Sequence, residues 1–249
     1  MCGICGILNL QEASPTSPEL LRRMVGALHH RGPDARGGYR DGDVALGHSR
    51  LSIIDLEGGN QPLCNETRDI WVVFNGEIFN YVELGDELQA AGHHLATKSD
   101  TEIIVHAYEQ WGLDFLRRLV LARDRAGIRP LYYAKVGKEL LFASEVKSLL
   151  EHPGLPRALD RRGLAQVFTF WAPVAPRTAF AGISQLPPGH MMCVEKGKLE
   201  TRRYWQASFL PPKTESGRPY TNVKETLRLA EELRERLEAS TKLRMLRSD

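Results

Sequence analysis

The sequence lacks the features that would place the protein in a membrane, on nucleic acid or outside the cell. It has no run of about eighteen apolar residues, so no segment can span a bilayer as a helix. The net charge is only +2, which gives no strong attraction to nucleic acid or to an acidic lipid surface. The N-terminus has neither a basic start nor a following apolar stretch. We therefore expect no secretory signal peptide and a cytoplasmic protein whose thiols stay reduced.

Cysteine is also scarce, with only four residues, at positions 2, 5, 64 and 193. A zinc or redox site on Cys2 and Cys5 would need a second ligand pair or a helix N-terminus nearby, and the sequence shows neither. We therefore expect no metal site, and expect Cys5, Cys64 and Cys193 to be small apolar core residues. A redox or zinc protein remains an alternative, which requires Cys2 and Cys5 to be paired or to share a metal.

The composition that is present is typical of an ordinary folded protein. Its 249 residues are 42% hydrophobic and 26% charged, enough for one large core. Short apolar runs predict strands, and apolar residues at three- and four-residue spacing predict helices. The predicted strands lie at residues 4–10, 44–48, 70–74, 130–134, 140–143, 190–194 and 199–204. The predicted helices lie at 18–29, 81–91, 101–111, 144–150 and 160–170. Ser99 and Asp100 lie at the start of the helix at 101–111, where cap residues are expected.

The last part of the sequence predicts a second domain. Residues 210–221 are rich in proline, glycine and serine, which is typical of a linker after a first domain at 1–209. Residues 222–249 begin with a capping-box-like Asn and Glu, and apolar residues then recur at helical spacing. This pattern predicts an amphipathic helix, with Glu232 and Arg236 placed for a favourable pair on its polar side.

The most informative residue is Cys2, directly after Met1. Once Met1 is removed, Cys2 carries a nucleophilic thiol and a free α-amine, whose pKa of roughly 7.7–8.0 leaves part of it unprotonated at neutral pH. One residue then supplies both nucleophile and base, as in enzymes with an N-terminal nucleophile. Gly3 and Gly6 leave room beside it. Read alone, the same cysteine is equally a frayed terminal residue beside a short strand.

Five polar corners follow within the first hundred residues, at 29–34, 48–55, 60–63, 75–80 and 99–102. Each lies near the end of a predicted apolar element, where functional residues are usually mounted. Taken one at a time, these residues have ordinary explanations. The Asn-Gly at 75–76 is typical of a turn, Arg50 could form a surface ion pair, and Asp100 could cap a helix. Their order along the chain, together with the terminal cysteine, is the specific signal.

In that order, the corners and Cys2 resemble the glutamine amidotransferase domain of glutamine-hydrolysing asparagine synthetases, class II amidotransferases of the N-terminal-nucleophile hydrolase fold. The segments Arg-Gly-Pro-Asp (31–34), Arg-Leu-Ser-Ile-Ile-Asp (50–55) and Asn-Gly-Glu-Ile-Phe-Asn (75–80) carry the resemblance. It extends from Cys2 to about Trp205 and then to the first helix of the next domain. It implies an α+β protein, a four-layer α/β/β/α sandwich followed by a linker and that helix.

The resemblance implies a catalytic role for three residues. Cys2 would attack the δ-carbonyl of glutamine, and the Asn75 side chain with the Gly76 N–H would form the oxyanion hole. The amine of Cys2 would protonate the departing ammonia, and water would then hydrolyse the thioester to glutamate. Nearby loops would be anchored by His30, Arg31 and Asp34.

The resemblance also implies how glutamine, a zwitterion with an amide at its far end, would be held. Arg50 would pair with its α-carboxylate. Asp100 would pair with its α-ammonium, assisted by Glu77. The methylene walls and further backbone groups would come from Leu51, Ser52, Ile53 and Ile54.

The implied overall reaction converts aspartate, glutamine and ATP to asparagine, glutamate, AMP and pyrophosphate. This chain would supply the glutaminase half, which needs no cofactor, while ATP and Mg²⁺ would belong to a synthetase domain in cis. That domain's Ser-Gly-Gly-Leu-Asp-Ser loop does not occur in this sequence, so we expect a truncation before it. Two alternatives remain: an amidotransferase with another carboxylate acceptor, and a silent domain that retains Met1. Family members are commonly dimeric, so a homodimer is a further expectation.

One stretch, residues 116–124, departs from the family pattern. In the family, a segment with a buried, aromatic-rich strand separates its Phe-Leu-Arg-Arg part from its Leu-Ala-Arg-Asp part. Loss of that strand would expose two sheet edges and open a core void. We therefore expect the sequence to join two stretches across an omitted segment. A Cα step well above about 3.8 Å between Phe115 and Leu121 would mark it, and unbroken steps would mean a real deletion.

Overall fold

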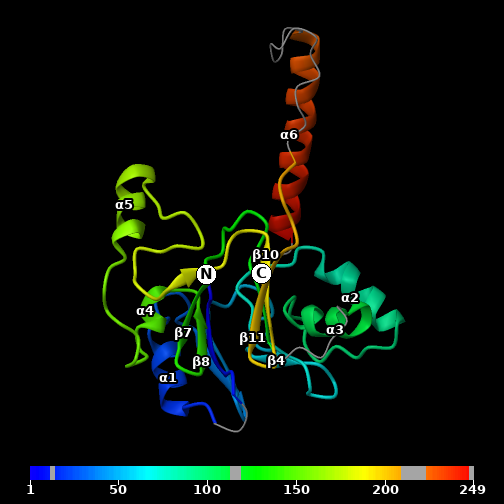
Figure 1. Ribbon diagram of the computed structural model, residues 1–249. Coiled ribbons are helices and arrows are strands. Elements are labelled where there is room, and N and C mark those ends of the chain that lie inside the picture. The colour runs from blue at the N-terminus through cyan, green and yellow to red at the C-terminus, as the bar shows by residue number, and fades with distance from the viewer. Residues whose placement is uncertain (12–14, 113–118, 209–222, 247–249) are drawn as a thin grey trace. The chain divides into compact units, whose positions relative to one another are not determined.

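The structure is a computed structural model that describes residues 1–11, 15–112, 119–208 and 223–246. The chain divides into two compact units, Met1–Trp205 and Gln206–Asp249, which are described separately (Figure 1). The predicted linker at residues 210–221 falls entirely outside the described ranges. The expected chain gap between Phe115 and Leu121 also falls there for most of its length, so it stays a prediction.

The first sheet of the large unit has β1 near its centre and the order β2-β3-β1-β8-β7-β9. All its paired neighbours run antiparallel. Residues of β1 point alternately to its two faces, and both faces are buried because an apolar layer covers each. The strands are β1 Gly3–Asn9, β2 Ala35–Asp41, β3 Val44–Arg50, β7 Tyr132–Val136, β8 Glu139–Ala143 and β9 Ser184–Gln185.

The second strand layer is smaller and is divided into two pieces. A three-stranded sheet has the order β11-β10-β6, and β4 with β5 forms a separate hairpin. Within the described ranges, β6 pairs with β10 on one edge only. The strands are β4 Leu63–Cys64, β5 Trp71–Val72, β6 Leu119–Ala122, β10 His190–Glu195 and β11 Lys198–Arg203.

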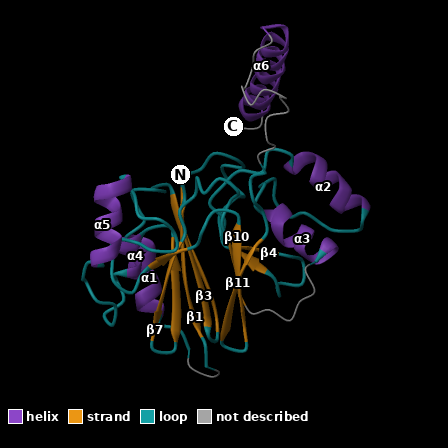
Figure 2. Ribbon diagram, turned by 45° about the horizontal axis from the view of Figure 1, so that its top comes forward, coloured by secondary structure: helices purple, strands orange, loops and turns teal. Residues whose placement is uncertain are grey.

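Helices cover the outer sides of both strand layers (Figure 2). α1 (Pro18–Gly26) packs on β1 and β3, α4 (Val146–Leu149) packs on β8, and α5 (Arg161–Phe170) lies on the same side. α3 (Glu102–Trp111) contacts β4, β5 and α2 (Tyr81–Ala90) on the opposite side. The resulting α/β/β/α layers confirm the predicted sandwich. No helix within the described ranges is long and apolar enough to cross a membrane.

The α1 helix shows how local sequence sets these elements. The Ser17 hydroxyl accepts a hydrogen bond from the Leu20 N–H at 3.2 Å, and Pro18 occupies the first turn, where its missing N–H costs nothing. Leucines and Met24 then recur on one face and are buried against the first sheet. The second unit contains α6, Val223–Leu246, in which the predicted Arg236–Glu232 ion pair forms at 2.8 Å.

Most predicted strands and helices are confirmed, with two informative differences. The β2 strand was not predicted because its sequence, Ala-Arg-Gly-Gly-Tyr-Arg-Asp, has few apolar residues and lies at the sheet edge. The prediction that Ser99 and Asp100 cap the third helix is wrong. Its N-cap is Thr101, and the Asp100 carboxylate instead accepts a hydrogen bond from the Ile78 N–H at 2.9 Å.

A close approach at Gly6 generates a stability prediction. A Cβ on Gly6 would lie 2.3 Å from the Phe142 ring and 2.6 Å from the Ala45 carbonyl oxygen. We expect Gly6→Ala to lower the free energy of unfolding by about 1–3 kcal/mol, because overpacking forces its neighbours apart. Urea titrations of the full chain would measure it. Gly26→Ala is the control, since a Cβ there meets nothing within 4 Å. Equal unfolding midpoints for the two variants would contradict this account.

Candidate active site

One pocket gathers most of the predicted site residues. It takes residues from the start of β1, the end of β3 and the loops that precede α2 and α3. Of the predicted residues, Ser52 and Asn75 are not part of its lining. The lining consists of Cys2, Arg50, Leu51, Ile53, Ile54, Gly59, Gln61, Phe74, Gly76, Glu77, Ser99, Asp100 and Thr101.

Cys2 lies at the start of β1, beside the end of β3. Gly3 pairs with Ser49, so the thiol reaches the backbone of Leu51. The sulfur lies 3.4 Å from the Leu51 nitrogen, which donates to it, and 3.5 Å from the Leu51 oxygen. The Arg31 guanidinium donates to the Cys2 carbonyl at 2.9 Å and to Glu145 at 3.0 Å. This anchor fixes the backbone that carries the sulfur.

Arg50 brings a buried positive charge to the pocket, with only 4% of its surface exposed. Its guanidinium donates to neutral acceptors only: the Asn60 side-chain oxygen at 2.8 Å and the carbonyls of Ile54, Asp55 and Leu56. None of the ion pairs among the described residues involves Arg50. A buried cation without an ionic partner favours binding of an anion such as a carboxylate.

Asp100 brings a carboxylate to the same pocket and is 5% exposed. Burial raises the pKa of Asp100 above its ordinary value, and the nearby Glu77 adds to the increase, while backbone N–H groups of Ile78 and Thr101 oppose it. A cation bound here would favour the charged carboxylate and relieve both effects. Arg50 and Asp100 together therefore suit a zwitterion.

Asn75 follows β5 and carries an unsatisfied donor. Its side-chain nitrogen is buried and has no hydrogen-bond partner among the described residues. Leaving a buried amide donor unpaired costs about 1–3 kcal/mol, so such groups call for an explanation. The next residue, Gly76, lines the pocket, where a Cβ would lie 2.4 Å from the Phe74 ring. The segment thus carries a buried side-chain donor that no acceptor among the described residues satisfies.

Side-chain bonds that the sequence analysis did not predict hold these loops together. The Gln61 side chain donates to the Thr101 hydroxyl at 3.1 Å and accepts from the Phe74 N–H at 2.6 Å. It therefore joins the loop before Asn75 to the loop that contains Asp100. The corner at 60–63 was the available signal, but no role followed from it. Ser52 is held from outside the pocket, since its N–H donates to the Asp34 carboxylate at 2.8 Å.

The described cysteines give no support to the redox or zinc alternative at Cys2 and Cys5. None of the four cysteines forms a disulfide. Cys5 is fully buried among apolar residues of α1 and the first sheet, and this burial raises its pKa to about 12. Cys193 is buried as predicted, whereas Cys64 is only half-buried because it lies in the short β4.

Comparisons with known proteins agree with this geometry. The family described as "Glutamine amidotransferase domain" matches residues 1–120 and 116–205. The chain belongs to this amidotransferase family. The two matched ranges meet at residues 116–120, where the omitted family segment is expected. The amidotransferase is 35% identical over 224 residues to asparagine synthetase (glutamine-hydrolysing) 3 of Bacillus subtilis, and 35% identical over 246 residues to asparagine synthetase 1 of that organism.

These alignments include most of the amidotransferase but only part of each relative. They cover 82% and 91% of this chain, and 36% and 39% of the relatives, so the chain spans little more than a third of their length. Among solved structures, the fold is similar to glutamine phosphoribosylpyrophosphate amidotransferase from B. subtilis, with a TM-score of 0.58 and 19% identity. That match covers 83% of this chain and 50% of the solved chain, and it shows the common fold.

His48, buried in β3 beside the site, makes the stability of the amidotransferase depend on pH. Burial lowers the pKa of His48 from 6.5 to about 4, and the charge of Arg50 contributes. Between those values the unfolded chain binds a proton that the folded chain does not, so stability falls as the pH falls. We expect the free energy of unfolding to fall by up to about 3 kcal/mol between pH 6.5 and 4. The His48→Asn variant should not show this decrease. Urea unfolding across that range tests this, and parallel pH profiles for both proteins would refute it.

Proposed function

We propose that this amidotransferase hydrolyses glutamine to glutamate and ammonia through a thioester on Cys2. The observation that carries the proposal is one pocket that contains a thiol, a buried cation and a buried carboxylate. Arg50 suits the α-carboxylate of glutamine, and Asp100 suits its α-ammonium. The walls formed by Leu51, Ile53 and Ile54 suit the methylenes between the two ends of the substrate.

The catalytic steps follow from the groups at the pocket. Removal of Met1 turns the backbone nitrogen of Cys2 into a free amine, which accepts the thiol proton. The sulfur attacks the δ-carbonyl, and the oxygen takes up negative charge beside the Asn75 amide and the Gly76 N–H. The C–N bond then breaks as the amine returns the proton to the leaving nitrogen, releasing ammonia. Water attacks the γ-glutamyl thioester, which releases glutamate and restores the thiol.

We further propose that the ammonia serves asparagine synthesis, with this chain acting as the glutaminase half. The support is the identity to two bacterial glutamine-hydrolysing asparagine synthetases over most of this chain. Glutamine hydrolysis on Cys2 uses no cofactor in this proposal. ATP and Mg²⁺ would be bound by a synthetase domain in cis, where aspartate is activated to accept the ammonia.

Replacement of the nucleophile tests the hydrolysis directly. We expect Cys2→Ala to abolish ammonia release from glutamine, because Cys2 is the one cysteine among the residues that line the pocket. Glutamate and ammonia would be quantified without ATP. Cys64→Ala, which changes a half-buried cysteine outside the pocket, is the matched control and should retain activity.

The mass of the intact active protein supplies the second arm of this test. A mass one methionine short of the full sequence is expected, because Met1 blocks the amine that the mechanism uses. Activity in Cys2→Ala, or full activity in protein that retains Met1, would exclude this mechanism.

The unpaired donor of Asn75 generates a separate prediction. We expect Asn75→Ala to lower kcat about 10²–10³-fold with little change in KM, since the donor acts on charge that develops only in the transition state. Steady-state glutaminase kinetics would measure both constants. Asn80→Ala is the control, because the Asn80 side chain is exposed and makes no cap hydrogen bond to α2. An increase in KM alone would instead assign Asn75 to ground-state binding.

A further inference from the structure

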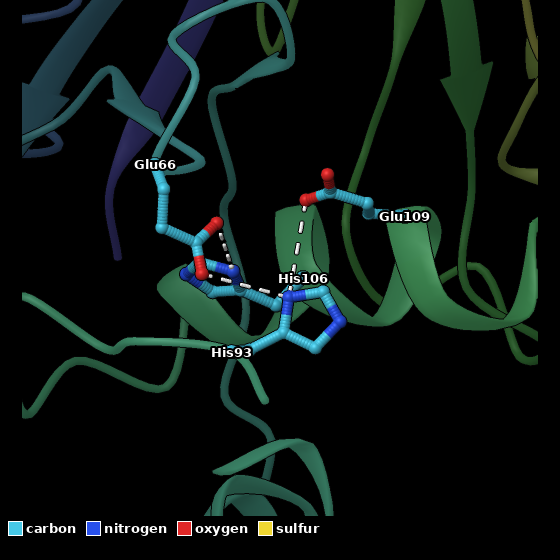
Figure 3. Close-up of side chains that lie close together, drawn as sticks. All are labelled: Glu66, His93, His106 and Glu109. Carbon is cyan, nitrogen blue, oxygen red and sulfur yellow. Dashed lines mark ion pairs between the residues drawn. The ribbon is translucent and has the colours of Figure 1, made fainter. Parts of the chain in front are cut away.

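A second cluster of polar side chains lies apart from the pocket and is unexplained by glutamine hydrolysis. It consists of Glu66 from the turn between β4 and β5, His93 from the loop between α2 and α3, and His106 and Glu109 from α3 (Figure 3). None of the four lines the pocket. Two imidazoles and two carboxylates from three separate segments are a typical donor set for a divalent cation.

The spacing of the donor atoms fits one ion. Each residue offers one ligand atom, and all four atoms lie within 4.8 Å of one another. The Nδ1 of His106 lies 3.1 Å from Oε2 of Glu66, whereas the Nδ1 of His93 lies 3.6 Å from Oε1 of Glu66 and 3.9 Å from Glu109. A tetrahedral ion with bonds of about 2.0–2.1 Å holds its ligands roughly 3.3–3.4 Å apart. These three separations lie near that value, and the separations within the four-atom set reach no more than 4.8 Å.

Both histidines are oriented by groups outside the cluster. The Nε2 of His106 lies 3.4 Å from the buried Glu102 carboxylate, and the Nε2 of His93 lies 3.1 Å from the Gln110 side-chain oxygen. An acceptor at Nε2 places the proton there and leaves the Nδ1 lone pair facing the cluster. Metal-bound histidines are commonly held in this way by an outer carboxylate or amide oxygen.

The state of His106 separates a metal site from a simple ion pair. This side chain is fully buried, and its Nδ1 has no hydrogen-bond partner among the described residues. The atom is close to Glu66, but the geometry is not that of a hydrogen bond from an Nδ1 proton to the carboxylate. A cation bound at the cluster would satisfy this buried nitrogen, which lies 3.1 Å from a Glu66 oxygen without a hydrogen bond to it.

We propose that Glu66, His93, His106 and Glu109 bind one structural Zn²⁺ ion per chain. Two carboxylates neutralise the charge of the ion, and the mixed nitrogen and oxygen donors in fourfold number suit zinc better than Mg²⁺ or Ca²⁺, which prefer six or more oxygens. The ion joins the β4–β5 turn to α3 and to the loop before it. Because Asp100 lies between His93 and His106, the ion also holds the segment that carries the pocket carboxylate.

Zinc titration of the chelator-treated full chain tests the proposal. We expect about one ion per chain by elemental analysis, a higher unfolding temperature with zinc, and a Co²⁺ derivative with the visible spectrum of a four-coordinate site. His93→Gln and Glu109→Gln should each lower the affinity at least about tenfold. These two ligands are chosen because they are less buried than His106, so the variants should still fold.

Two matched variants make the test specific. His94 is the exposed neighbour of His93, and its side chain is outside the cluster. The variant His94→Gln should therefore bind zinc as the wild type does. Gln110→Ala removes only the group that orients His93, and should weaken binding about 10–100-fold while the stoichiometry stays at one. Titration of Cys2→Ala removes the active-site thiol as a competing ligand. Failure of the wild type to bind zinc, or equal binding by wild type, His93→Gln and Glu109→Gln, would overturn the proposal.

Discussion

The pairing of β1 with β3 is the constraint on which the rest of the molecule depends. Its register, with Gly3 opposite Ser49, places the sulfur of Cys2 against Leu51 and beside Arg50. Because both faces of β1 are packed, a slip of one residue would put a larger side chain where Gly6 lies against Phe142 and Ala45, so packing fixes the register strongly. The position of the nucleophile is therefore determined by the same apolar contacts that stabilise the core.

Beyond the strand ends, hydrogen bonds from polar side chains, rather than strand pairing, hold the loops in place. Arg50 collects carbonyl groups from the loop that follows it, Gln61 joins two loops, and Asp34 holds the backbone of Ser52. The buried and part-buried bonds of Arg50 and Gln61 are costly to break, because each would leave an unsatisfied donor or acceptor. These bonds preorganise the pocket although its loops have no regular secondary structure. A site that stabilises a developing charge requires such preorganisation.

The sequence predicted the layers and most of the pocket, but not how the pocket is held. Apolar periodicity identified β1, β3, β8 and the main helices, whereas the polar edge strand β2 has no such signal. Arg50 and Asp100 were identified from the order of their corners, although Asp100 was also taken as a helix cap. Gln61 and the four residues of the zinc cluster were missed, because their significance depends on contacts between segments distant in the chain.

The pairing of β1 with β8 places Cys5 opposite Ala143, so the N-terminal strand cannot form this pairing until a much later part of the chain has been synthesised. At about 5–20 residues per second, a ribosome needs roughly 7–30 s to synthesise the intervening chain. Until then β1 has β3 as its partner, and its other edge is unpaired. Met1 is 51% exposed in the folded protein, so completion of the sheet leaves the N-terminus accessible for removal of Met1.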